Sequence, residues 1–218
     1  MFGGRGMIPP KNLVSILLAT IMVLSTFTFM APDTAVASPS KTLYVGGSGP
    51  NNYTHIQDAI DDAPDECTIF IYDDSSPYRE DFVVYKPLKL LGEKRDTTVL
   101  DGIMIVNANN VSAQDLNITG HMEFISGRGC HVRYCSFNDG GLFFHASQSS
   151  VHDCSFLRGS IGLQGTDNHI FKNTFRECGD GIGYDWSGPN LIENNSFTSN
   201  NIGIYIHGGK QSYGSTIK

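Results

Sequence analysis

Residues 151–156 read VHDCSF. The same phrase stands 19 residues earlier as VRYCSF (132–137) and 19 residues later as IFKNTF (170–175), and a fourth copy, IENNSF, follows at 192–197. Self-similarity at a nearly constant period indicates that one structural unit is repeated along the chain. A period of about 20 residues is too short for a helical hairpin, and the β-branched and aromatic residues favour strands.

Each copy therefore predicts one coil of an all-β, parallel β-helix, in which equivalent residues stack about 4.8 Å apart along the axis. A leucine-rich repeat has a similar period, but its Leu-x-x-Leu-x-Leu phrase is missing here. The repeated Phe and the Cys or Asn two residues before it are expected to face inward, with Asn forming a hydrogen-bonded ladder and Cys filling the same space. These ladder residues are Phe137, Phe156, Phe175, Phe197, Cys135, Cys154, Asn173 and Asn195.

The first part of the chain is expected to direct export. Basic residues at positions 5 and 11 precede an uncharged apolar run, and Ala35-Val36-Ala37 supplies a small-residue cleavage site. Residues 1–37 are therefore predicted to be a signal peptide, with an uncleaved N-terminal anchor as the alternative. In both cases the rest of the protein is expected outside the cytoplasm, secreted or at the cell surface.

Two regions are expected after this segment. Residues 38–110 should form an N-terminal cap and the first irregular coils, with a short capping helix that begins after Thr54 as its N-cap and ends before Pro64. Such a helix covers strand edges that would otherwise be open. Residues 111–218 should hold the regular coils. Because Ile217 follows Ile192 by 25 residues and indicates the start of a further coil, the chain is expected to be a C-terminally truncated piece or to meet a partner there.

Two stretches resemble a known kind of N-terminal cap: TLYVGGSGPNNYTHIQDAIDDAP (42–64) and TIFIYDDSSPYREDFVVYKPLKLLGE (68–93). They are similar to the caps of right-handed parallel β-helices of the pectin-lyase superfamily, namely the pectin methylesterases and the NosD-like repeat proteins. The later Ile-x-x-Asn-x-Phe phrases look like the NosD-like repeat. The resemblance implies a right-handed parallel β-helix. It implies no esterase activity, because only the structural Tyr-x-Glu of the cap (Tyr78, Glu80) is matched and the catalytic motifs are missing.

Candidate catalytic carboxylates lie two residues after the Phe positions. Asp139, Arg158 and Glu177 fall in consecutive coils, which would place the two carboxylates roughly 9.5 Å apart, a separation typical of inverting glycosidases. Arg158 between them favours instead an exposed ladder of alternating charge, because it holds both carboxylates ionised whereas a general acid needs a raised pKa. Asp180 and Asp185, in irregular segments, complete these weak candidates.

A candidate ligand-binding site lies where the 19-residue step is broken. Residues 176–181 and 185–190 contain extra residues, and insertions in a solenoid form outer loops, where binding often occurs. The second loop contains the only tryptophan, Trp186, beside Tyr184 and Asp185. An aromatic ring beside polar groups suits a sugar ring. A tryptophan that packs in the core or anchors the loop is the alternative.

The metal-ligating residue types do not form a known spacing. Cys135 and Cys154, two of five cysteines, should be stacked neighbours; inert buried thiols are expected, with a disulfide as the alternative. The resemblance to NosD-like proteins implies a link to copper-enzyme maturation, and thiolate and imidazole ligands suit copper. However, no Cys-x-x-Cys or His-x-x-x-His spacing occurs, and the histidines other than His131 and His169 share no column of the repeat. We expect no cofactor, while calcium and copper remain open.

Charge and short motifs bound the possible partners. The formal net charge of −7 and the lack of a basic block disfavour nucleic acid as a ligand. Four Asn-x-Ser/Thr sequons are compatible with an exported protein; their asparagines are Asn52, Asn110, Asn117 and Asn194. A membrane is expected as a partner only through an uncleaved N-terminal segment.

The function that the sequence favours is a non-catalytic, exported module that binds a polysaccharide or a cell-surface protein, because the repeats carry no catalytic constellation. One alternative is a carbohydrate-active lyase or hydrolase of the pectin-lyase superfamily. The other is a NosD-like accessory factor in copper-enzyme maturation.

Overall fold

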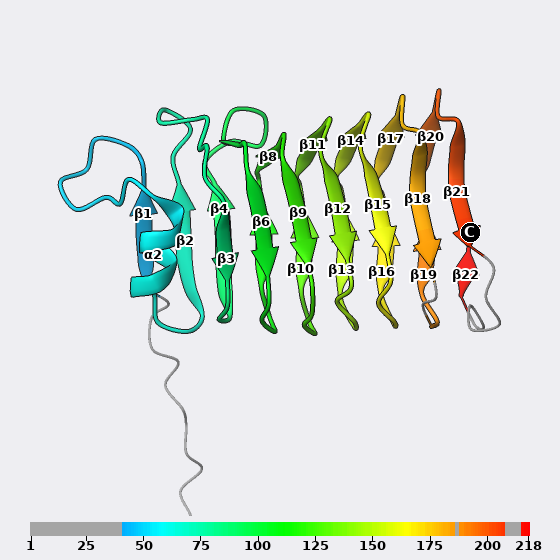
Figure 1. The fold of residues 1–218 in the computed structure, drawn as a ribbon, viewed down its shortest axis with the longest axis horizontal. Coiled ribbons are helices and arrows are strands. Elements are labelled where there is room, and N and C mark those ends of the chain that lie inside the picture. The colour runs from blue at the N-terminus through cyan, green and yellow to red at the C-terminus, as the bar shows by residue number, and fades with distance from the viewer. Residues whose placement is uncertain (1–40, 186–187, 208–214) are drawn as a thin grey trace, which may run out of the picture. The chain divides into compact units, whose positions relative to one another are not determined.

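The computed structural model describes residues 41–185, 188–207 and 215–218. In this part of the chain short strands of successive coils pair in parallel, which confirms the predicted parallel β-helix. Figure 1 shows the coils side by side along one axis, with the strands of equivalent position stacked on one another. The expected signal peptide, residues 1–37, lies outside the described residues.

Three parallel sheets, here named A, B and C, form the walls of the described coils. Sheet A consists of β1 (Thr42–Val45), β2 (Cys67–Ile71), β4 (Leu88–Gly92), β7 (Ser112–Gln114), β10 (His131–Arg133), β13 (Ser150–His152), β16 (His169–Phe171), β19 (Leu191–Glu193) and β22 (Thr216–Ile217). Sheet B consists of β5 (Val99–Leu100), β8 (Asn117–Ile118), β11 (Ser136–Asn138), β14 (Ser155–Leu157), β17 (Thr174–Arg176) and β20 (Ser196–Thr198). Sheet C consists of β3 (Phe82–Val84), β6 (Ile103–Val106), β9 (His121–Phe124), β12 (Gly141–Phe144), β15 (Ser160–Leu163), β18 (Asp180–Asp185) and β21 (Ile202–His207).

The repeated phenylalanines form a stack in the core. Phe137, Phe156, Phe175 and Phe197 are paired in register along sheet B. Their ring centroids are 4.5, 4.7 and 5.0 Å apart and the rings lie within 10° of parallel. Burial of such rings removes a large apolar area from water, so the repeat recurs because one core position recurs.

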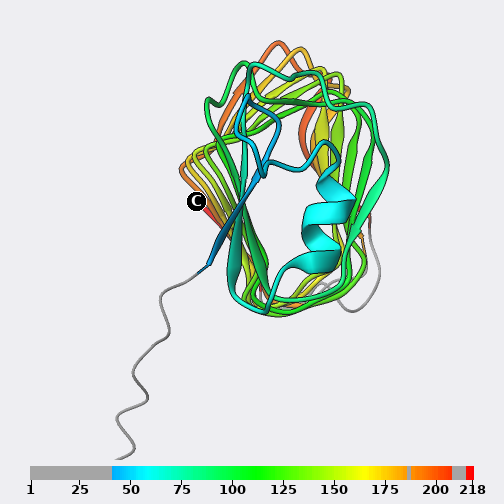
Figure 2. The same ribbon diagram turned by 90° about the vertical axis from the view of Figure 1, so that its left-hand side faces the viewer.

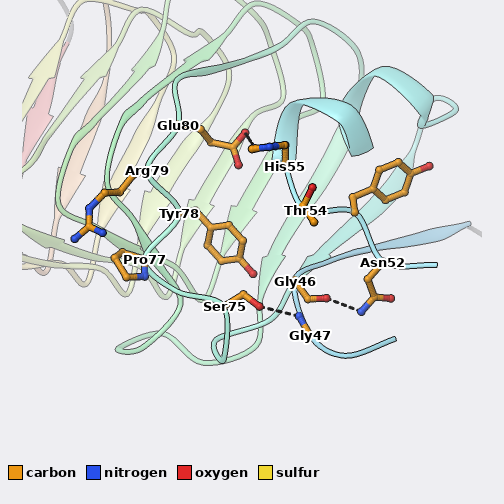
Figure 3. Close-up of a pocket in the computed structure, with 11 residues that line it drawn as sticks. Gly46, Gly47, Asn52, Thr54, His55, Ser75, Pro77, Tyr78, Arg79 and Glu80 are labelled. Atoms are coloured by element: carbon orange, nitrogen blue, oxygen red, sulfur yellow. Dashed lines mark hydrogen bonds and ion pairs between the residues drawn. The ribbon is translucent and has the colours of Figure 1, made fainter. Parts of the chain in front are cut away.

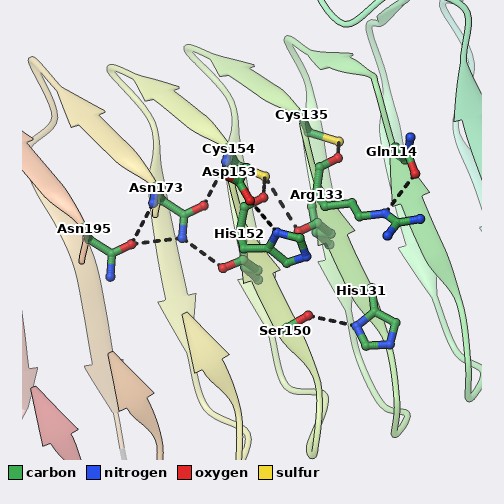
Figure 4. Close-up of polar contacts among 12 residues, drawn as sticks. Gln114, His131, Arg133, Cys135, Ser150, His152, Asp153, Cys154, Asn173 and Asn195 are labelled. Atoms are coloured by element: carbon green, nitrogen blue, oxygen red, sulfur yellow. Dashed lines mark hydrogen bonds and ion pairs between the residues drawn. The ribbon is translucent and has the colours of Figure 1, made fainter. Parts of the chain in front are cut away.

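The Cys or Asn position forms a second inward column, which Figure 4 shows across successive coils. The Asn173 Nδ2 donates to the Val151 carbonyl oxygen (2.9 Å), and the Cys154 Sγ donates to the equivalent carbonyl of the coil before, that of Val132 (3.7 Å). Only Asn can also accept: the Asn173 Oδ1 accepts the Cys154 N–H (3.0 Å). Both residue types fit this column because both reach the equivalent carbonyl, but Asn makes two hydrogen bonds to the coil before it, one as donor and one as acceptor.

The coils turn their corners through residues with left-handed backbone. Tyr134, Asp153 and Lys172 directly precede the Cys or Asn column and have φ of 53°, 53° and 55°. This conformation costs an L-residue other than glycine about 1 kcal/mol. The side chain at such a corner projects outward, while the following residue enters the core.

One short helix, α2 (Ile56–Asp62), covers the N-terminal end of the coils; Figure 2 shows it lying across the opening formed by the first coil. Its inward side chains, Ile56, Ala59 and Ile60, are buried. The prediction of Thr54 as N-cap is wrong: the N-cap is His55 and its side chain makes no capping hydrogen bond. Instead the Glu80 carboxylate accepts the Ile56 N–H at 2.9 Å, so a residue from another segment satisfies the first turn.

The tyrosine of the Tyr-x-Glu pair, Tyr78, anchors the same cap. The Tyr78 hydroxyl lies 2.8 Å from the Tyr72 carbonyl oxygen and 3.2 Å from that of Val45, and burial raises its pKa to about 12. A Cβ at Gly46, where φ is +76°, would lie 2.1 Å from this hydroxyl. Glycine at position 46 therefore permits both the left-handed turn and the close approach of the tyrosine.

Candidate binding surface on sheet A

The outer face of sheet A carries a continuous row of side chains, one from each coil. The pairing registers align Phe70, Leu91, Gln114, Arg133, His152, Phe171 and Glu193. Near the middle of the row the Arg133 Nε donates to the Gln114 Oε1 at 2.8 Å, which Figure 4 shows. The row therefore combines apolar, amide, charged and aromatic groups on one face.

Four rings gather toward the C-terminal end of this strip; we call Tyr134, His152, His169 and Phe171 the ring cluster. The Phe171 ring lies between two imidazoles, with centroids 4.7 Å from His152 and 4.1 Å from His169. The Tyr134 ring meets the His152 ring edge-on at 5.9 Å. Tyr134 is 42% exposed and Phe171 is half-buried, so solvent reaches the cluster.

The imidazoles of this face are held by polar neighbours. The His152 Nδ1 lies 2.8 Å from the Asp153 Oδ2, and the His169 Nε2 lies 3.0 Å from the Glu193 Oε1. The His131 Nδ1 lies 2.8 Å from the Ser150 Oγ. Burial, and then the nearby charge of Arg133, lower the pKa of His131. This face therefore combines oriented hydrogen-bonding groups with apolar ring surface.

The strongest catalytic candidates form an ion ladder at an exposed corner. The Arg158 guanidinium contacts Asp139 at 2.5 and 2.8 Å and approaches Glu177 to 3.7 Å. The hydrogen bond from Arg158 lowers the pKa of Asp139. All three side chains are about half exposed and lie at corners with left-handed backbone. An ionised, solvated Asp139 is suited to charge pairing and not to donating a proton.

The other candidate catalytic and ligand-binding residues differ in where they lie. Asp180 is exposed at the start of β18, and the side chain of Asp185 lies outside the described residues, as does Trp186. Tyr184 was expected beside a ligand, but its ring is buried because it pairs with Leu163 in an inward column of sheet C. Its hydroxyl donates to the Gly188 carbonyl oxygen at 2.7 Å. Tyr184 therefore packs in the core and anchors the segment that follows it.

One of the predicted glycosylation asparagines cannot act as a surface acceptor in this fold. Asn117 is only 9% exposed, its Nδ2 donates to the Asp96 carbonyl oxygen (3.0 Å), and its Oδ1 accepts from Asn138 (2.8 Å). The amide is thus part of the corner between sheets A and B. Asn52 is half-buried, with its Nδ2 bonded to the Gly46 carbonyl oxygen, while Asn110 and Asn194 are exposed.

The N-terminal cap contains a hollow of about 270 Å³. Figure 3 shows that its walls come from the turn at Gly46 and Gly47 and from the segment that holds Tyr78 and Glu80. The Gly47 N–H donates to the Ser75 Oγ at 3.0 Å, and the Glu80 carboxylate caps α2. These polar groups already bond one another, so the hollow is explained by the construction of the cap.

The chain matches the family model described as periplasmic copper-binding protein (NosD) over residues 81–217. This chain belongs to the NosD family. The match begins in the first coils and includes the whole of the outer face at the ring cluster. No curated protein and no solved structure matches the chain. The NosD family is periplasmic by its description, which agrees with the predicted location outside the cytoplasm.

Copper is implied by the family's description, and thiolate and imidazole groups are the donors that suit it. The five cysteines are free and buried. Burial raises the pKa of the thiols of Cys130, Cys154 and Cys178, which opposes thiolate formation. In the described ranges no group of three or more His, Cys, Asp or Glu side chains is placed to hold a metal ion. These residues therefore do not fit a copper centre of thiolates.

The sequence pattern missed two groups on this surface. His152 was placed in no shared column, yet it lies one strand from His131 because outward residues recur at every second position and His131 pairs with Ser150. That alternation was a usable signal. Arg95 carried no signal, because it reaches Ser136 and Ser155, 41 and 60 residues away.

In the described part of the chain no helix is long and apolar enough to cross a membrane.

Proposed function

We propose that this NosD-family protein is an exported, non-catalytic binding module, secreted or at the cell surface, that takes a glycan on the outer face of sheet A. The observation that carries the proposal is the ring cluster. Solvent-accessible rings supply apolar faces for sugar rings, and neighbouring imidazoles and carboxylates supply hydrogen bonds for hydroxyl groups. Three of the four rings lie on strands β13 and β16, so the sheet fixes their geometry, and Tyr134 lies at the corner that directly follows β10.

The ion ladder supports a role without catalysis. Arg158 stabilises the charged form of Asp139, whereas a glycosidase acid must keep its proton at the working pH. A carbohydrate-active enzyme remains the alternative. Detection of sugar products released from a polysaccharide decides between a binding module and an enzyme. A cell-surface protein is the alternative ligand for the same face.

The test is a glycan-array measurement on the full chain beside Phe171→Ala and Tyr134→Ala variants. Loss of one aromatic platform should weaken glycan binding at least about tenfold. Phe143→Ala is the matched control, because Phe143 is 46% exposed on sheet C. Binding that survives both ring variants but is lost in Trp186→Ala would move the site to the 185–190 loop. Release of reducing or unsaturated sugars would favour the enzyme.

A second candidate function is an accessory role in copper-enzyme maturation. It is favoured by the family's description; the imidazoles of His131, His152 and His169 lie on one face but do not form a group placed around one ion. Neutral imidazole is a good ligand for Cu(II). Titration of the full chain with Cu(II), followed by the histidine NMR signals, tests it: stoichiometric binding that is lost in His152→Ala would support this role, and binding no tighter than to free imidazole would exclude it.

A further inference from the structure

Arg95 is held at the corner between sheets A and B by two different coils. Its Nε donates to the Ser136 Oγ at 2.9 Å, and its Nη2 donates to the Ser155 Oγ at 2.8 Å and to the Cys135 carbonyl oxygen at 3.1 Å. The guanidinium is half-buried. Three acceptors on two rungs fix its position along the axis, as a binding group requires.

All three of these acceptors are uncharged. Among the residues that the structure describes, no carboxylate lies within ion-pair distance of Arg95, and the two N–H groups of its Nη1 have no acceptor. Half-buried charges in proteins are usually paired. Arg95 thus presents a fixed positive charge with unused donors.

The loop that carries Arg95 is itself anchored. The Lys94 Nζ and the Thr97 Oγ1 both donate to the Asp73 Oδ2, at 2.8 and 2.7 Å. The Lys94 N–H donates to the Thr98 Oγ1 at 3.1 Å, and Thr98 is fully buried. The backbone of Arg95 is therefore held by its loop, and its guanidinium is held by the two coils that it contacts.

A groove of about 540 Å³ opens beside this guanidinium. It is lined by Arg95, Tyr134, Asp153, Cys154, Ser155, Lys172 and Thr174. Lys172 is exposed and has no hydrogen bond or ion pair within the described ranges. The one lining carboxylate, Asp153, lies 2.8 Å from the His152 imidazole, as Figure 4 shows. The groove thus contains two cations without carboxylate partners, Arg95 and Lys172. Its one carboxylate, that of Asp153, is already bonded to His152.

We infer that this corner groove is an oxyanion subsite, in which Arg95 and Lys172 bind a carboxylate or sulfate group carried by a sugar. The inference rests on the proposed glycan-binding function and names its ligand class. Tyr134 belongs to both the ring cluster and the groove, so a sugar stacked on the cluster places a substituent beside the two cations. The Thr174 hydroxyl adds a neutral donor, whereas the Ser155 hydroxyl already donates to the Ser136 Oγ at 3.2 Å. The protein as a whole has a formal net charge of −7 and repels anions. An anionic ligand is therefore attracted only by the local positive charge of Arg95 and Lys172.

The experiment is isothermal titration of the full chain with four probes: a glucuronate oligosaccharide, a sulfated oligosaccharide, the neutral oligosaccharide of the same backbone, and inorganic sulfate. The variants are Arg95→Gln and Lys172→Gln. Lys172→Gln is decisive, because Lys172 supports no described contact and its loss should leave the fold unchanged. Arg128→Gln, which replaces an exposed cation in the turn between β9 and β10, outside the sheet A strands and the groove, is the matched control.

We expect each groove variant to weaken binding of the charged probes about tenfold, since a charge-assisted hydrogen bond is lost. Binding of the neutral probe to either groove variant, and binding of all probes to the Arg128→Gln variant, should be unchanged. The ratio between the glucuronate and sulfated probes identifies the source of the oxyanion. Added salt should weaken binding of the charged probes only.

Two outcomes would separate the groove from the proposed function. Charged and neutral oligosaccharides that bind equally, with no loss in Lys172→Gln, would overturn the groove and leave the glycan proposal intact. If inorganic sulfate binds the parent chain, loses its binding in both groove variants, and no oligosaccharide binds, the oxyanion site is supported and the glycan proposal is overturned. A wild-type chain that binds none of the four probes overturns both.

Discussion

The cap and the regular coils of this protein are stabilised in different ways. In the coils, one interaction is repeated: Phe stacks on Phe, and each Asn of the corner column bonds to the equivalent atoms of the coil before it. In the cap, each interaction occurs once, as with Glu80 on the first turn of α2 and Tyr78 on the carbonyl oxygens of two other segments. The stability of the coils is thus spread over many equivalent contacts, whereas the stability of the cap depends on individual residues.

This difference also explains where binding groups can arise. Inward positions of the coils are all committed to the columns, so variation is confined to the corners and to the outer faces. The ring cluster and Arg95 both use that freedom. Five substitutions can sharpen the comparison or break it, and they follow in order of the expected effect.

The largest effect is expected at the centre of the phenylalanine stack. Phe156→Ala removes a buried ring that contacts Phe137 and Phe175, and it should lower the free energy of unfolding by about 3–5 kcal/mol. Urea denaturation followed by circular dichroism measures it. Phe143→Ala, which is exposed, should stay within about 0.5 kcal/mol of the parent. Equal losses in the two variants would show that the stack has no special role.

The next effect is expected in the Asn column. Asn173→Ala removes the acceptor of the buried Cys154 N–H and the side-chain donor to the Val151 carbonyl oxygen, which should cost about 1–3 kcal/mol. Asn201→Ala, at an exposed position, is the matched control. If the same urea experiment finds Asn173→Ala as stable as that control, the column is not a source of stability.

A smaller effect is expected in the cap. Glu80→Ala removes the acceptor for the Ile56 N–H and should destabilise the cap by about 1 kcal/mol, as the loss of an N-cap does. Hydrogen exchange of the α2 amides measures it, and these should exchange faster while the amides of β14 do not. Asp65→Ala, an exposed acid near the helix, is the control. Faster exchange in both regions would mean that cap and coils unfold together.

The cap should also respond to acid. Hydrogen bonds from Lys94 and Thr97 lower the pKa of Asp73 from 3.8 to about 2. A depressed pKa contributes stability that is present above pH 3.8 and is lost as the pH falls toward 2. The thermal midpoint of the parent should therefore fall over this window more steeply than that of Asp73→Asn. Parallel curves for the two proteins would show that Asp73 does not contribute.

The smallest effect is expected at the ion ladder. Asp139→Asn should leave the thermal midpoint at pH 7 unchanged, because the pair is solvated and Asn also tolerates the left-handed backbone of this corner. Arg158→Gln serves as the reciprocal variant. A marked loss of stability in either, or of any sugar-releasing activity, would give the ladder a role that its exposure does not suggest.

Much of the fold could be predicted from periodicity. The 19-residue step predicts the coil, and the phrase predicts which residues align, because equivalent positions of a solenoid meet equivalent neighbours. The export segment and Trp186 remain predictions, since they lie outside the described residues. Where the repeat is irregular, the sequence was less informative: Tyr184 was a candidate ligand contact beside Trp186, and its ring is buried in the core.

The sequence by itself determined the scaffold: which residues stack, that one helix covers the N-terminal end, and that the chain is of the NosD kind. Only the tertiary structure decided the surface. The ring cluster joins residues from different coils, Glu80 caps a helix 24 residues earlier, and Arg95 reaches a coil 60 residues later. Periodicity specifies what recurs at a fixed step. Contacts made once, between segments at no fixed spacing, are set by how the coils and loops pack in space.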